Sequence, residues 1–505
     1  MAQFLAIDLG TTNIRSIMFD ERGRVLGQAF RKVTTFNPKS EIAVQDPEEV
    51  WKLTVETMRE SVKASHISTE DISAISFSAR MHGTMLLKRD GTPLTHLFTW
   101  LDRRASSQVE TISQTIDPYD LYQRTGCPLL FIYPFAKLFW MKENIPQKLE
   151  SCSKVLSAKD YVIFKLTGNF YTDRSLASGT QLLNIHSLDW DETLLAMVDL
   201  DADKLPSLVN ETEVVGELSR EIARTIGLRR GIPLIVGASD GALNNIGLGA
   251  TARGIAAMNI GTSGAIRILS ERPFIDTHRA AHFFCYYAGF GSWLPGGAIS
   301  NAGNLLRWFR DNLGHQEVVE AENRGVDPYE VILERAASIE PGAEGLLLLP
   351  FFSGERFPIR DPKARGVLFG LTLRHGKGHI ARAILESVVF TLRWIMESLQ
   401  EHSAIIREIR VGGGGARSSV WRQIQADVLG KPVVHTRVEE SSALGAAMLS
   451  AIGLGIYEDL KSASKNMIET VARQEPDLQT HTNYQRSFEM YKDYYYASRK
   501  FFEKL

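Results

Sequence analysis

Two short turn sequences, half a chain apart, constrain this chain more than any other feature. The first is Gly10-Thr11-Thr12 and the second is Gly261-Thr262-Ser263. The β-rich runs that flank them are Phe4–Ile7 and Ile14–Phe19 for the first turn, and Ile255–Met258 and Ala265–Ile268 for the second. The pattern predicts tight turns between antiparallel strands, in which glycine admits a ligand close to the backbone and converging N–H groups form an anion site. Two such turns predict a duplicated fold that grips a nucleotide from both sides.

Asp8 stands at the end of the first apolar run, just before the first turn. A carboxylate gains nothing from burial there unless it holds a cation, a water molecule or a polar partner. A simple turn-capping role is the alternative. We favour the cation role because hydroxyl and N–H donors follow Asp8 immediately.

The length of 505 residues exceeds what one hydrophobic core usually supports, so we expect two large domains with a ligand in the cleft between them. A boundary is expected near residues 245–255, which divides the chain into 1–250 and 251–455, followed by a helical extension over 456–505. The net charge of −2, from 57 basic and 59 acidic residues, argues against binding nucleic acid or a membrane surface. Small, soluble partners are favoured, and the oligomeric state stays open, with a homodimer as one option.

Cysteine usage and the amino terminus bear on the cellular compartment. The chain has 3 cysteines and no Cys-x-x-Cys spacing, so neither a disulfide framework nor a structural zinc site is expected. The first residues lack a basic segment followed by a long apolar core, and the longest apolar run, Leu346 to Phe352, is too short to span a bilayer. We therefore expect a cytoplasmic protein.

The remaining pattern predicts a strand-rich start followed by α/β alternation. A helix should begin at Asp46-Pro47-Glu48-Glu49, where Asp46 can cap, Pro47 suits the first helical position and Glu49 can reach back to the cap. Further strands are expected at 25–31, 72–77 and 409–411, and further helices at 137–143, at 158–166 and from Ser419 to Gly430. The aromatic stretch near the carboxyl terminus, 484–502, is expected to be a packed helix.

Asp240 is the strongest candidate for a catalytic residue. It follows a short apolar strand and sits between Ser239 and Gly241, in a segment that otherwise avoids charge. A carboxylate at the carboxyl end of a strand reaches the cleft, where it can accept a proton from a substrate hydroxyl as that oxygen attacks phosphorus. The alternative is that Asp240 caps the helix that follows.

Phosphoryl transfer needs few parts, and the chain offers a candidate for each. The phosphates would be held by the two turns, through Gly10, Thr11, Thr12, Gly261, Thr262 and Ser263. Asp8 would position Mg²⁺ through water, because Mg²⁺ gives up its water ligands reluctantly. The glycine run Gly412–Gly415, ahead of a helix, could let an adenine or a ribose lie flat against the backbone. The sequence contains neither a P-loop nor a strand-linked dinucleotide motif, which removes both of those interpretations.

Three polar clusters remain as candidates for an acceptor site. They are Arg80-Met81-His82-Gly83, Trp100-Leu101-Asp102-Arg103-Arg104 and Asp173-Arg174-Ser175. A Trp beside Asp and Arg suits a polyol, since it offers an apolar face and edge hydrogen bonds. Such trios are also common as surface salt links, and an isolated histidine such as His82 is more often structural.

These motifs resemble those of the FGGY family of carbohydrate kinases, within the actin-like ATPase superfamily, over nearly the whole chain. Besides the two turns, the resemblance rests on Tyr133–Met141, on Gly366–Leu371 through His379 to Glu386, and on Gly413–Arg417. It implies an α/β fold of two actin-like (ribonuclease H-like) domains with an interdomain cleft, and the use of ATP and Mg²⁺. The site residues that it implies are Asp240 as catalytic base and as a metal ligand with Asp8; Arg80, Met81, His82, Trp100 and Asp102 around the sugar; and Gly413, Gly414 and Arg417 at the adenosine.

Segments near the site resemble gluconate kinases more than xylulose kinases. The Met81-His82-Gly83 segment is shared with xylulose kinases, whereas Gly237–Gly241, Ile260–Arg267 and Leu306–Trp308 look more like gluconate kinases. The expected reaction is phosphorylation of a terminal hydroxyl of an open-chain sugar acid, gluconate to 6-phosphogluconate, with xylulose or another sugar of the family as the alternative. An aldonate carboxylate requires an Arg fork or equivalent donors. The candidates are Arg80, Arg103, Arg104, Arg174 and Arg267.

A function of another class is a non-catalytic, sugar-responsive nucleotide switch that keeps the fold without the chemistry. A regulator of that kind usually brings a helix-turn-helix segment with a basic face, and an actin-like polymer lacks a sugar pocket. Retention of Asp240 favours the kinase.

Overall fold

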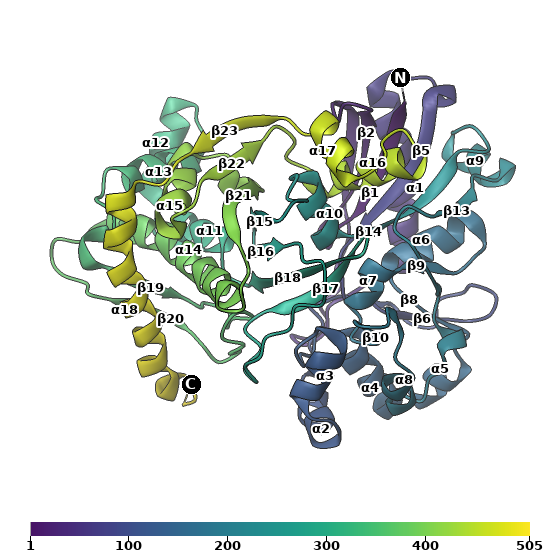
Figure 1. Cartoon of the computed structure of the whole chain (residues 1–505), viewed down its shortest axis with the longest axis horizontal. Coiled ribbons are helices and arrows are strands. Elements are labelled where there is room, and N and C mark those ends of the chain that lie inside the picture. Colours follow the sequence, from purple (N-terminus) through teal and green to yellow (C-terminus); the bar gives the residue numbers. More distant parts are fainter. Residues whose placement is uncertain (1, 505) are drawn as a thin grey trace.

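The computed structural model describes residues 2–504 and contains two α/β units that lie side by side (Figure 1). Each unit is built around one mixed sheet, of six strands in the first unit and seven in the second. The described helices include none that is long and apolar enough to cross a membrane.

The first sheet has the strand order β13-β14-β5-β1-β2-β3. Its strands are β1 (Gln3–Leu9), β2 (Asn13–Asp20), β3 (Val25–Lys32), β5 (Ile72–Ala79), β13 (Val214–Glu217) and β14 (Pro233–Ser239). Strands β1, β2 and β3 form an antiparallel meander, and β5 and β14 run parallel to β1. The first predicted turn, residues 10–12, joins β1 to β2 as expected.

The second sheet repeats this arrangement in the order β17-β18-β16-β15-β21-β22-β23. Its strands are β15 (Gly254–Ile260), β16 (Gly264–Ile268), β17 (Phe284–Gly289), β18 (Ser292–Ile299), β21 (Ile406–Gly412), β22 (Val433–Thr436) and β23 (Thr470–Gln474). Strands β15, β16 and β18 are antiparallel neighbours, with β17 added outside β18, and β21 and β22 run parallel to β15. Because both sheets place two parallel strands beside three antiparallel strands in the same order, the predicted duplicated, two-domain α/β fold is confirmed.

A long insertion between β5 and β13 forms a helical lobe at the lower end of the first unit in Figure 1. Its helices are α2 (Gln108–Thr115), α3 (Pro118–Thr125), α4 (Pro134–Asn144), α5 (Pro146–Ser151) and α8 (Glu192–Met197). The insertion also contains α6 (Ala158–Thr167), which packs in the core of the first sheet, and α7 (Arg174–Ser178), where the Ser178 hydroxyl accepts from the Tyr287 amide of β17. The helices predicted at 137–143 and 158–166 lie within α4 and α6.

Helix α1 (Pro47–Ser65) starts where the sequence predicts. The carboxylate of Asp46 accepts a hydrogen bond from the Glu48 amide at 2.9 Å and caps the helix. The predicted return contact is wrong, because the Glu49 carboxylate accepts from the Thr34 hydroxyl instead.

Helices of the second unit pack on its sheet and on one another. They are α11 (Gly303–Asn312), α12 (His315–Arg324), α13 (Pro328–Ala337), α14 (Lys377–Glu401), α15 (Ser419–Leu429) and α18 (Leu478–Phe502). Helix α18 buries Tyr484, Phe488 and Tyr491 in the same core as α14, which confirms the packed terminal helix. The expected extension 456–505 is not helical throughout, since β23 lies within it and pairs with β22 at the edge of the second sheet.

The chain returns to the first unit after β22. Helices α16 (Ser441–Gly453) and α17 (Leu460–Met467) share a core with Phe4, Ala6 and Ile235 of the first sheet. Figure 1 shows both helices beside β1 and β5, before β23 crosses back. The division expected from the sequence at residues 250 and 455 therefore does not follow the packing of these two helices.

Helix α10 (Asp240–Gly247) crosses α16 at two glycines. A Cβ on Gly247 would stand 1.8 Å from a backbone carbonyl oxygen of α16, and a Cβ on Gly445 would stand 2.3 Å from the Leu243 carbonyl oxygen. The close approach also lets the Ser442 hydroxyl donate to the Asp240 carbonyl at 3.2 Å. The crossing therefore fixes the start of α10, and with it Asp240.

We expect Gly445→Ala to destabilise the protein by about 2–3 kcal/mol, because the added methyl group meets backbone that cannot move aside easily. Urea unfolding measures the change. The matched control is Gly376→Ala, where a Cβ meets no atom within 4 Å and only a helix cap is altered, for a cost under about 1 kcal/mol. Equal unfolding midpoints for the parent and Gly445→Ala would contradict the proposed constraint.

Candidate active site

Three parallel strands end level at one edge of the first sheet and bring three polar residues together. The last residues of β1 and β14 both pair with Ala79, the last residue of β5. Asp8 lies one residue before the end of its strand, and Arg80 and Asp240 lie one residue beyond theirs. The position predicted for Asp240, at the carboxyl end of a strand, is confirmed.

Asp240 opens α10 but does not cap it. Ser239 is the cap, with its hydroxyl oxygen accepting a hydrogen bond from the Ala242 amide at 3.3 Å. The capping alternative for Asp240 is therefore wrong, because the residue before it already fills that role.

Asp8 and Asp240 are like charges in a poorly solvated place. Burial raises the pKa of Asp240 to about 6, the charge of Asp8 adds to the rise, and Arg267 opposes it. Burial also raises the pKa of Asp8, whose oxygens accept from the Ser78 hydroxyl at 2.8 Å and from Arg15 at 3.3 Å. A cation would relieve the repulsion, and hard carboxylate oxygens are donors that Mg²⁺ prefers. The two aspartates therefore fit the predicted metal role.

The first turn is fixed through its oxygens and leaves its amides open. Arg80 donates to the Gly10 carbonyl at 2.6 Å, and the Trp100 indole N–H donates to the Thr11 hydroxyl at 3.0 Å. Within residues 2–504, the N–H groups of Gly10, Thr11 and Thr12 donate to no protein acceptor. The turn therefore offers the amide-lined concavity that suits a phosphate.

The second turn is fixed in the same way by the start of α11. The amides of Gly303 and Asn304 donate to the carbonyls of Gly261 and Thr262 at 2.9 and 3.2 Å. In the described part of the chain, the N–H groups of Thr262 and Ser263 have no protein acceptor. The two turns thus share both their place in the sheet and their chemistry.

The glycine run lies directly beside the second turn. Gly412 pairs with Asn259 at the end of β15, and a Cβ on Gly413 would stand 2.4 Å from the Asn259 side-chain oxygen. Gly413 also has φ +75°, a conformation that favours glycine. Arg417 is exposed at the surface and forms an ion pair with Glu439. Gly413 is therefore needed for close packing against the second turn, and the open position of the run is Gly414, where a Cβ would meet no atom within 4 Å.

His82 is held in an unusual conformation with a defined tautomer. Its backbone has φ +68°, and Lys137 donates to its carbonyl at 2.6 Å. The ring Nδ1 lies 2.7 Å from the Gly179 carbonyl oxygen, which can only accept, so Nδ1 carries the proton. Burial lowers the pKa of His82 to about 3, so the ring is neutral and its Nε2 can accept a hydrogen bond. Met81 is buried and packs beside Gly179.

Trp100 meets the second unit. The Arg356 guanidinium, from the loop between β19 (Leu347–Pro350) and β20 (Gly366–Phe369), lies with its carbon 5.1 Å from the indole centroid. Arg356 is held by the Ile299 carbonyl at 3.1 Å and by the Ser300 hydroxyl at 3.3 Å. This contact joins the two units at the site.

Asp102 is buried within the loop that carries Trp100. Its side chain has no exposed surface, and its oxygens accept from Arg104 at 2.9 Å and from the Ala43 amide at 2.9 Å. The sequence places Asp102 among the sugar contacts, whereas these bonds give it a positioning role in the loop that carries Trp100.

Of the five arginines considered for a substrate carboxylate, Arg267 alone has a free and partly buried guanidinium in the described structure. Arg80 and Arg104 already donate to protein oxygens. Arg174 donates to the Leu188 carbonyl and the Asn210 side chain, and Arg103 is exposed. The Nε of Arg267 would stand 3.4 Å from a Cβ on the residue after Asp240, so it lies beside the catalytic candidate.

Two buried cations of the site, Lys137 and Arg356, escape prediction from the sequence. Burial lowers the pKa of Lys137 to about 7 despite the opposing charge of Asp102. A lysine inside an apolar helix is a signal that could have found it, because such a charge is buried only with a partner. No local pattern marks Arg356, which reaches the site from the other unit.

The arrangement defines a class of protein: a two-domain phosphotransferase that closes on a nucleotide and a polar acceptor. It combines a carboxylate that ionises near neutral pH, two amide-lined turns, and an acceptor region with an aromatic face. Residues 3–247 match the N-terminal domain of the FGGY family of carbohydrate kinases, and residues 256–454 match its C-terminal domain. The chain belongs to the FGGY family of carbohydrate kinases.

Known relatives cover almost the whole chain. A gluconokinase of Bacillus subtilis (strain 168) is 35% identical over 94% of this chain and 91% of its own length. A xylulose kinase of the same organism is 31% identical over 98% and 97%. The crystal structure of gluconate kinase from Lactobacillus acidophilus superposes with a TM-score of 0.93 and 30% identity, over 100% of this chain and 99% of that one.

We expect kcat/KM of the kinase reaction to fall about tenfold for each pH unit below about 6, because the base must be ionised to accept a proton. Loss of the positive charge in Arg267→Met should move this acid limb to higher pH, and loss of the negative charge in Asp8→Asn should move it lower. Steady-state rates across pH give the positions of the limbs. Ionisation of the substrates affects the parent and both variants equally, so it cannot shift the acid limb of one protein relative to another. An acid limb at the same pH in all three proteins would contradict the assignment of this limb to Asp240.

Proposed function

We propose that this carbohydrate kinase uses ATP to phosphorylate a terminal hydroxyl of an open-chain sugar acid, with gluconate, converted to 6-phosphogluconate, as its acceptor. The observation that carries the proposal is the partly buried guanidinium of Arg267, which donates to no protein acceptor in the described residues, with the guanidinium of Arg356 as a second positive charge in the site. Burial lowers the pKa of Arg267, and the charge of Arg356 lowers it further. Neither side chain has an ion-pair partner within 4.0 Å in the described residues, so an anion between them would be stabilised. An aldonate has such a carboxylate, and a ketose does not.

In the reaction, Asp240 acts as the general base. Above a pH of about 6 it is ionised and can take the proton of the acceptor hydroxyl as that oxygen attacks the terminal phosphorus of ATP. The bond between that phosphorus and the bridging oxygen breaks, and ADP leaves. The crossing of α10 and α16 keeps the carboxylate in position.

The two turns orient the nucleotide. The free amides of residues 10–12 and 262–263 would donate to phosphate oxygens from opposite sides, and the glycine run would support the adenosine. Asp8 and Asp240 would hold Mg²⁺, which when bound supplies positive charge to the phosphate oxygens. Positioning and charge stabilisation of this kind account for most of the rate in phosphoryl transfer.

The acceptor would lie between Trp100 and His82. The neutral His82 ring offers Nε2 as a hydrogen-bond acceptor, and the indole offers an apolar face. Arg356 over Trp100 joins the units at this point and would exclude water, which limits hydrolysis of ATP.

Xylulose is the second candidate acceptor. The segment Met81-His82-Gly83 and the 31% identity to a xylulose kinase favour it, and nothing in its chemistry calls for a pair of arginines.

We expect Asp240→Asn to lower the turnover of the kinase by about 10²–10⁴-fold, because a general base contributes about that much. Binding of ATP analogues should change little, since the amides of the turns are untouched. Stopped assays of ADP release and calorimetry measure the two quantities. Near-normal turnover by the variant would remove the mechanism, and absence of acceptor-stimulated ADP formation in the parent would favour the nucleotide switch.

We expect Arg267→Met to reduce kcat/KM for gluconate at least about tenfold more than for xylulose, the scale of losing a hydrogen bond to a charged group. The comparison of two acceptors cancels any shared effect through Asp240. Arg174→Met is the matched control, because its guanidinium is already bonded to Leu188 and Asn210. Equal losses for both acceptors, with a raised KM for ATP, would mean that Arg267 serves the phosphates and not a substrate carboxylate.

A further inference from the structure

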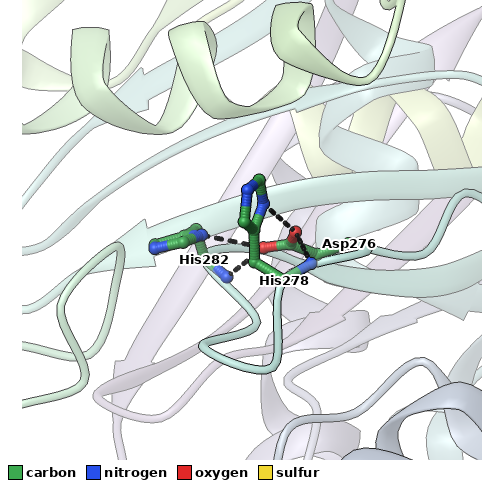
Figure 2. Close-up of side chains that lie close together, drawn as sticks. All are labelled: Asp276, His278 and His282. Carbon is green, nitrogen blue, oxygen red and sulfur yellow. Dashed lines mark hydrogen bonds and ion pairs between the residues drawn. The ribbon is translucent and has the colours of Figure 1, made fainter.

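Three histidines surround one buried aspartate in the loop between β16 and β17. Asp276 lies between His278 and His282, and both rings point their Nδ1 atoms at its carboxylate (Figure 2). The distances are 3.0 Å from His278 to Oδ1 and 2.9 Å from His282 to Oδ2. His402, which follows α14, brings its Nε2 to 3.2 Å from Oδ1. The Asp276 side chain has no exposed surface, and only about a tenth of His402 is exposed.

The loop does not need these rings as hydrogen-bond donors. The backbone amides of His278 and His282 already donate to the two oxygens of Asp276 at 2.8 and 2.7 Å and fold the loop around the carboxylate. Burial by itself would raise the pKa of Asp276, but hydrogen bonds from the His282 side chain and from these amides lower it to about 2. The imidazole rings of His278 and His282 therefore lie against a carboxylate whose two oxygens already accept hydrogen bonds from backbone amides.

His402 has the tautomer of a metal ligand. Its Nδ1 lies 2.9 Å from the Ser398 carbonyl oxygen and must carry the proton, while Nε2 accepts from the Thr277 amide at 3.0 Å. Nε2 carries no proton and stands 3.2 Å from Oδ1 of Asp276, but its lone pair is used by the Thr277 amide, with the Thr277 hydroxyl at 2.9 Å, so His402 would have to give up these contacts to bind an ion. This separation is about that of two ligands on one tetrahedral ion with bonds of about 2.0–2.1 Å. Donation of the second ring N–H to a backbone carbonyl is also usual for a metal-binding histidine.

We infer that Asp276, His278 and His282 form a binding site for a divalent transition-metal ion of the Zn²⁺ class, with His402 within reach as a fourth ligand. The ligand atoms of the first three residues lie within 4.8 Å of one another. One carboxylate oxygen with imidazole nitrogens suits Zn²⁺, whereas Mg²⁺ prefers oxygen donors. An ion bound at Nδ1 of His278 and of His282 would replace the contacts of these atoms with the Asp276 carboxylate and leave Nε2 of each ring as the N–H donor.

The site lies where the two units touch. The Tyr119 hydroxyl of α3 donates to the Asp276 carbonyl at 3.0 Å, and the Asp276 amide donates to the Tyr122 hydroxyl at 2.9 Å. An ion that fixes this loop would therefore also fix its contact with the insertion of the first unit.

The test is Zn²⁺ retention by the full-length protein. The protein is stripped with a chelator, given one equivalent of Zn²⁺ in excess Mg²⁺, and desalted before metal analysis. We expect about one equivalent in the parent and less than about a tenth in the double variant His278→Gln and His282→Gln, since loss of ligands weakens a site by more than tenfold. Co²⁺ in place of Zn²⁺ should give the visible spectrum of a nitrogen- and oxygen-bound ion in the parent only.

Two control variants locate the ion. His315→Gln removes an exposed histidine of α12 and should retain one equivalent, and Asp240→Asn should retain it as well. The Zn²⁺-dependent rise in melting temperature should be present in the parent and in both controls, and absent from the double variant. The inference would be overturned if the parent retained no Zn²⁺, or if the double variant retained as much as the parent. It would also be overturned if Asp240→Asn lost the ion.

Discussion

The active site depends on two carboxylates that the first sheet forces close together. Asp8 and Asp240 come from strands that end level on either side of β5, so their proximity follows from register and not from attraction. Their burial and their mutual repulsion raise the pKa of Asp240 to about 6, and Arg267 keeps it from rising further. Positive charge placed beside the pair would therefore favour the ionised form of Asp240.

The duplicated sheet explains why the two turns are so alike. Both units have the same strand order, so the turn after the first strand of each antiparallel set has an equivalent place and equivalent open amides. The strand beside it ends differently in the two halves. In the first unit β5 leads to Arg80, whose guanidinium fixes the turn. In the second unit β21 leads to Gly413, which lets the chain pack closely on Asn259 and Ile260. One topology therefore gives two turns of the same form with different neighbours.

Much of this could be predicted from the sequence because its signals are local. Strand–turn–strand patterns fixed the two hairpins, and an isolated carboxylate after an apolar strand marked Asp240. Features that depend on contacts between distant segments could not be predicted from the sequence. The return of α16 to the first sheet follows from glycine contacts between segments about 200 residues apart, and Arg356 reaches Trp100 from the other unit. Asp102 carries the right chemistry for a sugar contact, but its bonds to Arg104 turn it inward.

The sequence by itself determined the class of fold, the two turns and the position of Asp240 at the end of a strand, because each depends on residues that are neighbours in the chain. Only the tertiary structure decided which arginine is free, which tautomer His82 adopts and how far the pKa of Asp240 rises. These properties are set by burial and by charges brought together across the two units. The free energy of ionising a group depends on how deeply it is buried and on the charges near it. Residues distant in the sequence supply both, so they are known only once the chain has folded.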